Sequence, residues 1–217
     1  IASDFFAGNG FKAIPAMIVS ACMNTNPVMV YFGQEFGEMG MDSEGFSGRD
    51  GRTTIFDYWS VDSIRRWRSG GKFDGKTLTV EEKRLQNFYT NLLNLCNTEK
   101  AICEGEFYDL TYANLEGWTF NEHKQYAFFR KHGKELLLIV VNFDEMPARC
   151  GINIPPHAFE YLDIPQNGDK FLFVESSPWN ERVVITNKNV KEEDLPQILR
   201  YFDFCASEAG QKLAYWG

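Results

Sequence analysis

A run of five consecutive apolar residues, Val28 to Phe32, lies between Pro27 and Gly33 and constrains the fold more than any other segment. An unbroken apolar run of this length is typical of a parallel strand, because helices cover both faces of a parallel sheet. A piece of a buried helix is the alternative, but five residues are too few for one. The run therefore predicts a strand of an α/β layer.

Helical patterns lie on both sides of this run. From Phe11 to Cys22 apolar residues recur at helical spacing, and Pro15 fits if it lies in the first turn. Thr79 and Glu82 form a capping-box signature, which predicts the start of a second helix. Its apolar face is predicted to contain Leu85, Phe88, Tyr89, Leu92, Leu93 and Cys96.

The pattern changes to β after residues 105 to 118. Tyr126 to Arg130 and Glu135 to Phe143 predict a hairpin, with Gly133 in the turn at positive φ. Further strands are predicted at Ala148 to Ile154 and Phe159 to Leu162. The last part of the chain returns to a helical pattern, with one apolar face formed by Leu195, Ile198, Leu199, Phe202 and Cys205.

Composition excludes two classes of partner. The formal net charge is -8 and the basic residues are scattered, which argues against nucleic-acid binding. The longest apolar run, Leu136 to Val141, is far short of the ~20 residues that span a bilayer, so no membrane span is predicted. The five cysteines form no C-x-x-C pair, which favours buried free thiols.

Three segments resemble the alpha-amylase family of glycoside hydrolases. Asn26 to Glu35 resembles the eighth-strand motif of that family, with a proline, four hydrophobic residues, a glycine and a glutamate at fixed spacing, although Thr25 replaces a usual glycine. Arg84 to Glu106 resembles the last helix of the barrel and the segment that leads out of it. Ile1 to Ser3 is similar to the residues that follow the Asn-His-Asp motif in some bacterial members, which would place Ile1 a few residues after that motif.

The resemblance implies a fold of the α/β plus all-β class. Residues 1–104 would be the last helix, strand and helix of a (β/α)8 catalytic barrel, and residues 118–165 an antiparallel β-sandwich-type C-terminal domain, complete or missing strands. Residues 166–217 depart from the family pattern as a tail of strand and then helix. The tail weakly resembles the C-terminus of an extracellular solute-binding protein.

The same resemblance implies action on alpha-glucans, such as starch and maltooligosaccharides, in an extracytoplasmic or periplasmic location. Glycoside hydrolysis needs a pair of carboxylates across the scissile bond, and those of the family would lie upstream of Ile1. No catalytic residue is therefore assigned, and the chain alone is predicted to be inactive without the N-terminal part of its barrel. Hydrolysis and transfer stay open for the parent protein, and the alternative function is a non-catalytic carbohydrate-binding or solute-uptake module.

Five residues after the predicted strand are candidates for substrate binding, because barrel enzymes build their sites from the loops that come after the strands. They are Gln34, Glu35, Arg49, Asp50 and Arg52. Charged side chains form strong hydrogen bonds with sugar hydroxyl groups. The alternatives are a salt bridge that braces the loop and, for Glu35, a carboxylate held by backbone donors.

Other candidate groups favour structural roles. Phe56, Tyr58, Trp59 and Trp67 could stack on sugar rings, but their spacing favours packing in the core. The three histidines, His123, His132 and His157, lack the spacing of zinc ligands. Asp42, Glu44, Asp57 and Asp62 lack the dense alternation of a calcium loop, so neither a metal nor a cofactor is predicted.

Overall fold

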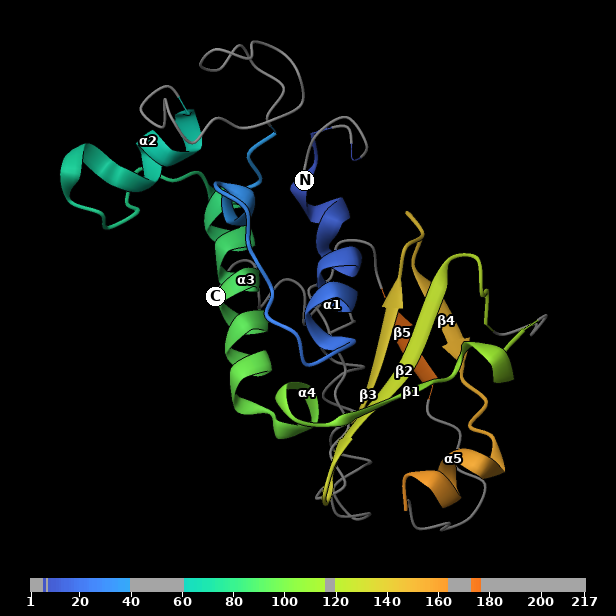
Figure 1. The fold of residues 1–217 in the computed structure, drawn as a ribbon. Coiled ribbons are helices and arrows are strands. Elements are labelled where there is room, and N and C mark those ends of the chain that lie inside the picture. The colour runs from blue at the N-terminus through green and yellow to red at the C-terminus, as the bar shows by residue number, and fades with distance from the viewer. Residues whose placement is uncertain (1–5, 7, 40–60, 116–119, 164–172, 177–217) are drawn as a thin grey trace, which may run out of the picture.

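The computed structural model describes residue 6 and residues 8–39, 61–115, 120–163 and 173–176. Helices cover one face of an antiparallel sheet, and a short helix and a small second sheet lie toward its other face (Figure 1). The α-helices are α1 (Ile14–Cys22), α2 (Asp62–Arg68), α3 (Val80–Thr98), α4 (Lys100–Cys103) and α5 (Pro156–Tyr161). The short 3-10 turns are η2 (Gly10–Ala13), η3 (Gln34–Phe36), η5 (Ser69–Gly71) and η6 (Thr111–Ala113). The strands are β1 (Glu106–Asp109), β2 (Gln125–His132), β3 (Glu135–Asn142), β4 (Ala148–Gly151) and β5 (Phe173–Ser176).

Both predicted helices are confirmed. Pro15 lies in the first turn of α1, where its missing N–H removes no helical hydrogen bond. At the start of α3 the Thr79 hydroxyl accepts from the Glu82 N–H at 3.1 Å, and the Glu82 carboxylate accepts from the Thr79 N–H at 2.8 Å. These reciprocal bonds satisfy two donors that a helix N-terminus would otherwise leave without partners.

The strand predicted at residues 28–32 is not formed. The segment is extended and lies alongside α1 and α3 (Figure 1), with Val28 and Val30 packed partly against the helices and Met29 80% exposed. Within the described residues, the backbone of Val28, Met29 and Val30 makes no hydrogen bond. A parallel strand forms only when neighbouring strands supply partners for its N–H and C=O groups, and the described part of the chain contains no parallel strand.

The predicted hairpin is confirmed. Strands β2 and β3 pair in antiparallel register from Gln125↔Asn142 to His132↔Glu135, and Gly133 takes φ 55° in the turn. Strand β1 pairs with the other edge of β2, which gives the order β1-β2-β3. Because β1 lies between residues 105 and 118, the sheet begins before the predicted hairpin.

The next predicted strands have different outcomes. Strand β4 lies within the segment predicted at 148–154 and pairs with β5 in a second small sheet. The strand predicted at Phe159 to Leu162 is wrong, because α5 occupies most of it. Pro156 in the first helical turn has its φ already set for a helix, and a short apolar run does not distinguish the two structures. The helix predicted at 195–205 lies outside the described residues.

The three-stranded sheet separates two hydrophobic cores, because successive side chains of a strand point to opposite faces. The larger core packs α1, α3 and α4 against the sheet residues Phe128, Leu137, Ile139 and Val141. The second core packs the opposite face against β4 and α5 through Ala127, Phe129 and Leu138.

Arg130 of β2 joins the helices to the sheet. It is only 1% exposed, and its guanidinium donates to the carbonyl oxygens of Ala101 (3.0 Å), Ile102 (2.7 Å), Gly105 (2.8 Å) and Met23 (3.0 Å). Met23 caps the C-terminus of α1, and the other three carbonyls lie at the C-terminal end of α4. The cation therefore satisfies carbonyls that helix ends leave without partners, at the negative ends of two helix dipoles.

The described cysteines, Cys22, Cys96, Cys103 and Cys150, are free thiols. The predicted burial holds for Cys22 and Cys150, whereas Cys96 is half-buried and Cys103 is exposed. The Sγ atoms of Cys22 and Cys96 lie 3.9 Å apart, where α1 contacts α3. Within the described residues, no helix combines the length and the apolar character needed to cross a membrane.

Candidate functional site

The turn after the extended segment positions the first two candidate residues. Gly33 (φ 78°) and Gly37 (φ 75°) lie on either side of η3, both in the left-handed region that glycine adopts without strain. A Cβ atom on Gly33 would lie 2.8 Å from the Glu38 Cβ. The chain can therefore reverse tightly here and place Gln34 and Glu35 next to α1 and α3.

Gln34 is 6% exposed, and protein groups occupy its amide. Its Nε2 donates to the Tyr89 hydroxyl at 2.9 Å and approaches the Met17 Sδ at 3.4 Å, while its Oε1 accepts from the Tyr31 N–H at 3.1 Å. These contacts fix the turn to α1 and α3. Burial raises the pKa of the Tyr89 hydroxyl, which keeps this phenol protonated beside the amide.

Glu35 is half-buried, and no cation of the described part of the chain forms an ion pair with it. Burial raises the pKa of its carboxyl, and a hydrogen bond from its own backbone N–H opposes the shift. The charged form is therefore less stable here than in water. Titratable groups whose pKa is shifted by burial are concentrated at functional sites. The half-buried carboxyl of Glu35 is therefore a candidate binding group.

Replacing Glu35 by glutamine is expected to raise the free energy of unfolding at pH 7.5. The folded pKa lies above the unfolded value, so the native state loses stability as pH rises from the unfolded pKa through the folded one. The variant has no carboxylate to ionise, so its advantage should disappear below about pH 4, where the wild-type glutamate is protonated in both the folded and the unfolded state. Urea denaturation of both proteins across this pH range measures the difference.

The matched control for this prediction is Glu106→Gln, because Glu106 is an exposed carboxylate on β1. We expect this control to retain the pH dependence of the wild type. A Glu35→Gln advantage that persists undiminished at pH 4 would contradict the burial argument.

Described residues from before and after the segment 40–60 form a third, small core, which consists of Phe36, Val61, Ile64 and Leu78. The Ser63 hydroxyl donates to the Glu38 carboxylate at 2.6 Å and links the two ends of this segment. The candidates Arg49, Asp50 and Arg52 lie outside the described residues, as do Phe56, Tyr58 and Trp59. Of the five candidates, the structure therefore describes only Gln34 and Glu35.

Trp67, the fourth aromatic candidate for stacking on a sugar ring, packs against the third core. Its ring centroid lies 6.2 Å from that of Phe36 and 5.4 Å from that of Phe73. This contact agrees with the packing role that its spacing favours.

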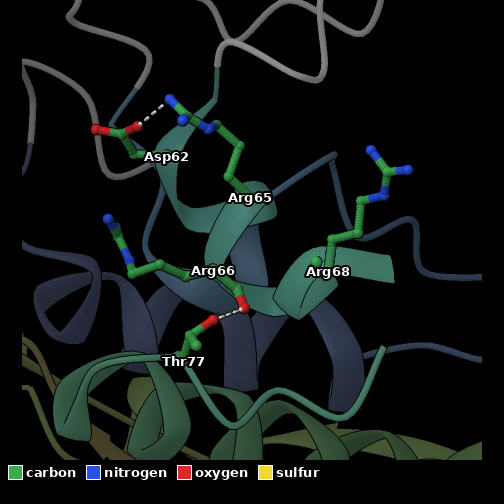
Figure 2. Close-up of a pocket in the computed structure, with 6 residues that line it drawn as sticks. Asp62, Arg65, Arg66, Arg68 and Thr77 are labelled. Carbon is green, nitrogen blue, oxygen red and sulfur yellow. Dashed lines mark hydrogen bonds and ion pairs between the residues drawn. The ribbon is translucent and has the colours of Figure 1, made fainter. Parts of the chain in front are cut away.

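A pocket of about 620 Å³ lies beside this core, on α2 and the segment after it. Its lining residues, most of them shown in Figure 2, are Asp62, Arg65, Arg66, Arg68, Gly70 and Thr77. The three guanidinium groups point in different directions, and Arg65 is paired with Asp62 at 3.4 Å (Figure 2). The sequence alone did not single out these arginines, and their divergence argues against a shared anion site.

Arg66 has a structural partner outside the pocket. Its Nε lies 3.0 Å from both carboxylate oxygens of Glu82, and its Nη2 lies 2.5 Å from one of them. The hydrogen bond to Glu82 raises the pKa of Arg66. Burial raises the pKa of Glu82, but the bonds from Arg66 and Thr79 outweigh it and lower that pKa overall. The pair therefore ties α2 to the capping box of α3.

Within the described residues, no group of three or more His, Cys, Asp or Glu side chains is placed to hold a metal ion. His123 and His157 are exposed and His132 is half-buried.

No protein-family model matches the chain, and no curated protein matches it. It is similar to the solved structure of AmyP in complex with maltose at 15% identity, covering 65% of this chain and 26% of that chain with a TM-score of 0.42. Isomaltulose synthase PalI from Klebsiella sp. LX3 is similar at 19% identity over 77% and 37% of the two chains, with a TM-score of 0.43. An AmyP variant in complex with maltotriose gives 13% identity over 78% and 33%, with a TM-score of 0.48.

The chain therefore spans between 26% and 37% of the length of these solved structures. These similarities give no support to the solute-binding resemblance of the tail, most of which lies outside the described residues.

Proposed function

We propose that this chain is the C-terminal part of an alpha-amylase-family glycoside hydrolase that acts on alpha-glucans such as starch and maltooligosaccharides. Residues 1–104 would complete a (β/α)8 catalytic barrel, and residues 118–165 would belong to the C-terminal β domain. The partner of the chain is then the N-terminal part of the same barrel, and its ligand is a maltooligosaccharide.

The observation that carries this proposal is the extended segment at Val28 to Tyr31. It has the alternating exposure of a strand, it packs against α1 and α3, and the backbone of residues 28–30 makes no hydrogen bond within the described residues. A β-segment in this state needs strands beside it. The N-terminal part of a barrel would supply them, and the exposed Met29 would then be covered.

The proposed substrate wall consists of Glu35, in the turn after this segment, and of Arg49, Asp50 and Arg52 further along the chain. These side chains would hydrogen-bond glucose hydroxyl groups, since charged side chains make stronger hydrogen bonds than neutral ones. Gln34 would hold the turn in place through its bonds to Tyr89 and Tyr31, and so position Glu35. The ends of the segment that carries the arginines are joined by the Ser63–Glu38 hydrogen bond.

The reaction itself is assigned to the remainder of the barrel. Hydrolysis of a glycosidic bond needs one carboxylic acid to protonate the leaving oxygen and a second carboxylate to attack or to activate water. In this proposal, the present chain supplies neither group and contributes to substrate binding. The purified chain should therefore release no maltose from starch.

The experiment starts with the intact mass and the N-terminal peptide map of the protein as its natural source makes it. A preceding sequence that ends in Asn-His-Asp close to Ile1 would support the proposal. In that complete enzyme, Arg52→Ala is expected to raise KM for maltooligosaccharides by a factor of about 10–100, because one charge-assisted hydrogen bond contributes ~1.5–3 kcal/mol and ~1.4 kcal/mol is a factor of ten.

Lys134→Ala, in the turn between β2 and β3, is the control and should leave both KM and kcat unchanged. An unchanged KM in Arg52→Ala would remove Arg52 from the substrate wall. A protein that starts at Ile1, or maltose release by the purified chain, would overturn the proposed function.

A further inference from the structure

A second pocket, of about 360 Å³, is lined by residues of β1, η6 and α5. Helix α5 lies on the side of the sheet away from α1 and α3 (Figure 1). Its lining is mainly aromatic and comprises Phe107, Tyr108, Asp109, Tyr112, His157 and Tyr161. The volume falls within the range of ~300–1,000 Å³ that is typical of small-molecule sites. The proposed function makes no use of these residues.

A hydrogen-bond network holds the aromatic rings of this pocket in place. The Tyr108 hydroxyl lies 2.6 Å from the Tyr112 hydroxyl and 2.9 Å from the His157 Nδ1. The His157 and Tyr161 rings are stacked, with centroids 5.8 Å apart and an interplanar angle of 20°. Burial and the hydrogen bond with Tyr112 raise the pKa of Tyr108 to about 12, so this phenol stays protonated at neutral pH.

The rings at the mouth of the pocket are exposed. Tyr112 is 53% exposed and Tyr161 is 55% exposed, whereas Tyr108 beneath them is buried. Grouped, exposed large aromatic side chains commonly mark a ligand-binding surface, because burying them elsewhere would be favourable. The Tyr161 hydroxyl and the His157 Nε2 have no hydrogen-bond partner among the described residues.

We propose that this pocket binds a pyranose ring of a neutral oligosaccharide. The flat apolar faces of Tyr112 and Tyr161 fit the C–H face of a sugar ring, and the phenol and imidazole groups at their edges can bond its hydroxyl groups. The pocket lining contains no Lys or Arg, which disfavours an anionic ligand. The Asp109 carboxylate accepts from the Thr111 N–H at 3.1 Å and so is already engaged in the turn.

The site is separate from the proposed substrate wall. Helix α5, which carries Tyr161, packs on the second core, whereas α3, which contacts the turn η3 that carries Glu35, packs on the larger core at the other face of the sheet (Figure 1). A sugar held here would anchor a polysaccharide away from the reacting bond. The choice of an alpha-glucan as the first probe rests on the proposed function. The binding of a sugar ring by the tyrosine side chains of this pocket does not depend on that function.

The test is isothermal titration calorimetry of the full chain with maltoheptaose, cellohexaose and xylohexaose. Binding of at least one oligosaccharide is expected, and Tyr112→Ala and Tyr161→Ala should each weaken it about tenfold, which corresponds to ~1.4 kcal/mol. Phe143→Ala is the control, because Phe143 is an aromatic side chain that is 49% exposed, follows β3 at the edge of the sheet opposite β1, and lies outside the pocket lining. Its dissociation constant should change less than twofold.

Circular dichroism and thermal melting identify variants that fail to fold, and both substituted tyrosines are exposed enough for the fold to persist. Lys134→Ala, in the turn between β2 and β3 and outside both the pocket lining and the substrate wall, should leave this binding unchanged. The inference is overturned if none of the three oligosaccharides binds, or if binding is insensitive to both tyrosines. Preferential binding of tetramethylammonium, the ligand of an aromatic cation cage, would also overturn it.

Discussion

Replacing Arg130 by methionine is expected to lower the free energy of unfolding by about 3–5 kcal/mol. The substitution keeps a long apolar side chain but removes donors from the carbonyls of Met23, Ala101, Ile102 and Gly105. Each buried acceptor that loses its partner costs ~1–3 kcal/mol. Since the guanidinium joins α1, α4 and β2, its removal should destabilise the whole fold and not only one element. Urea denaturation, followed by circular dichroism, measures it.

Two further variants test the cause. Arg130→Lys keeps the charge but has a single ammonium group, which cannot reproduce the spread of a guanidinium over four carbonyls, so it should recover only part of the loss. Lys131→Met changes the neighbouring cation, whose side chain lies at the other face of β2. A change below about 0.5 kcal/mol is expected for that control, as for most surface substitutions. A similarly small change in Arg130→Met would refute the role of the buried guanidinium.

Replacing Gly105 by alanine is expected to lower the free energy of unfolding by about 3 kcal/mol. A Cβ atom at this position would lie 2.5 Å from the carbonyl oxygen of Lys131 and closer still to that of Ala101. Both obstacles are backbone atoms, and Arg130 holds the Ala101 carbonyl in place. Forcing a methyl group into a packed site costs ~1–3 kcal/mol. We expect the cost for Gly105→Ala to lie at the upper end of this range, because the two carbonyl groups that the methyl group would meet cannot move away.

Gly133→Ala is the matched control for this second substitution. Gly133 has φ 55°, but no atom lies within 4 Å of its added Cβ, so only the left-handed backbone penalty of ~1–2 kcal/mol applies. Equal losses for the two variants would contradict the steric argument. The double variant of Gly105→Ala and Arg130→Met should lose less than the sum of the two, because both act on the Ala101 carbonyl.

The elements that the sequence predicts correctly are those whose signals are local. The capping box at Thr79 and Glu82 and the alternating strands around Gly133 depend on residues close together in the chain. Helix α5 was mistaken for a strand because its apolar residues are too few to show a period, although Pro155 and Pro156 before them favour a helix start.

The segment 28–32 shows a different limit. Its apolar run predicts a strand buried on both faces, whereas the segment exposes Met29 and Tyr31 and is not a strand. A strand is defined by backbone partners that lie elsewhere in the chain. The sequence also proposed Gln34 and Glu35 as candidate binding residues, and both lie in η3. It could not predict that Tyr89, far along the chain, receives the hydrogen bond of the Gln34 amide.

The aromatic pocket had no comparable signal. Tyr112 and Tyr161 are separated by a whole hairpin and strand β4, and ordinary spacing rules apply only within one helix or strand. The only local hint is the short interval between Tyr108 and Tyr112, which is common in any chain.

The sequence by itself determined the helices α1 and α3 and the hairpin of β2 and β3, because turns, caps and periodicity act over a few residues. Only the tertiary structure decided the environment of individual residues. It buried Arg130 among helix carbonyls, enclosed the amide of Gln34, left the backbone at residues 28–30 without described partners, and gathered the tyrosines around His157. The physical reason is that burial and hydrogen-bond partners are set by contacts between segments far apart in the chain, and no local pattern encodes them.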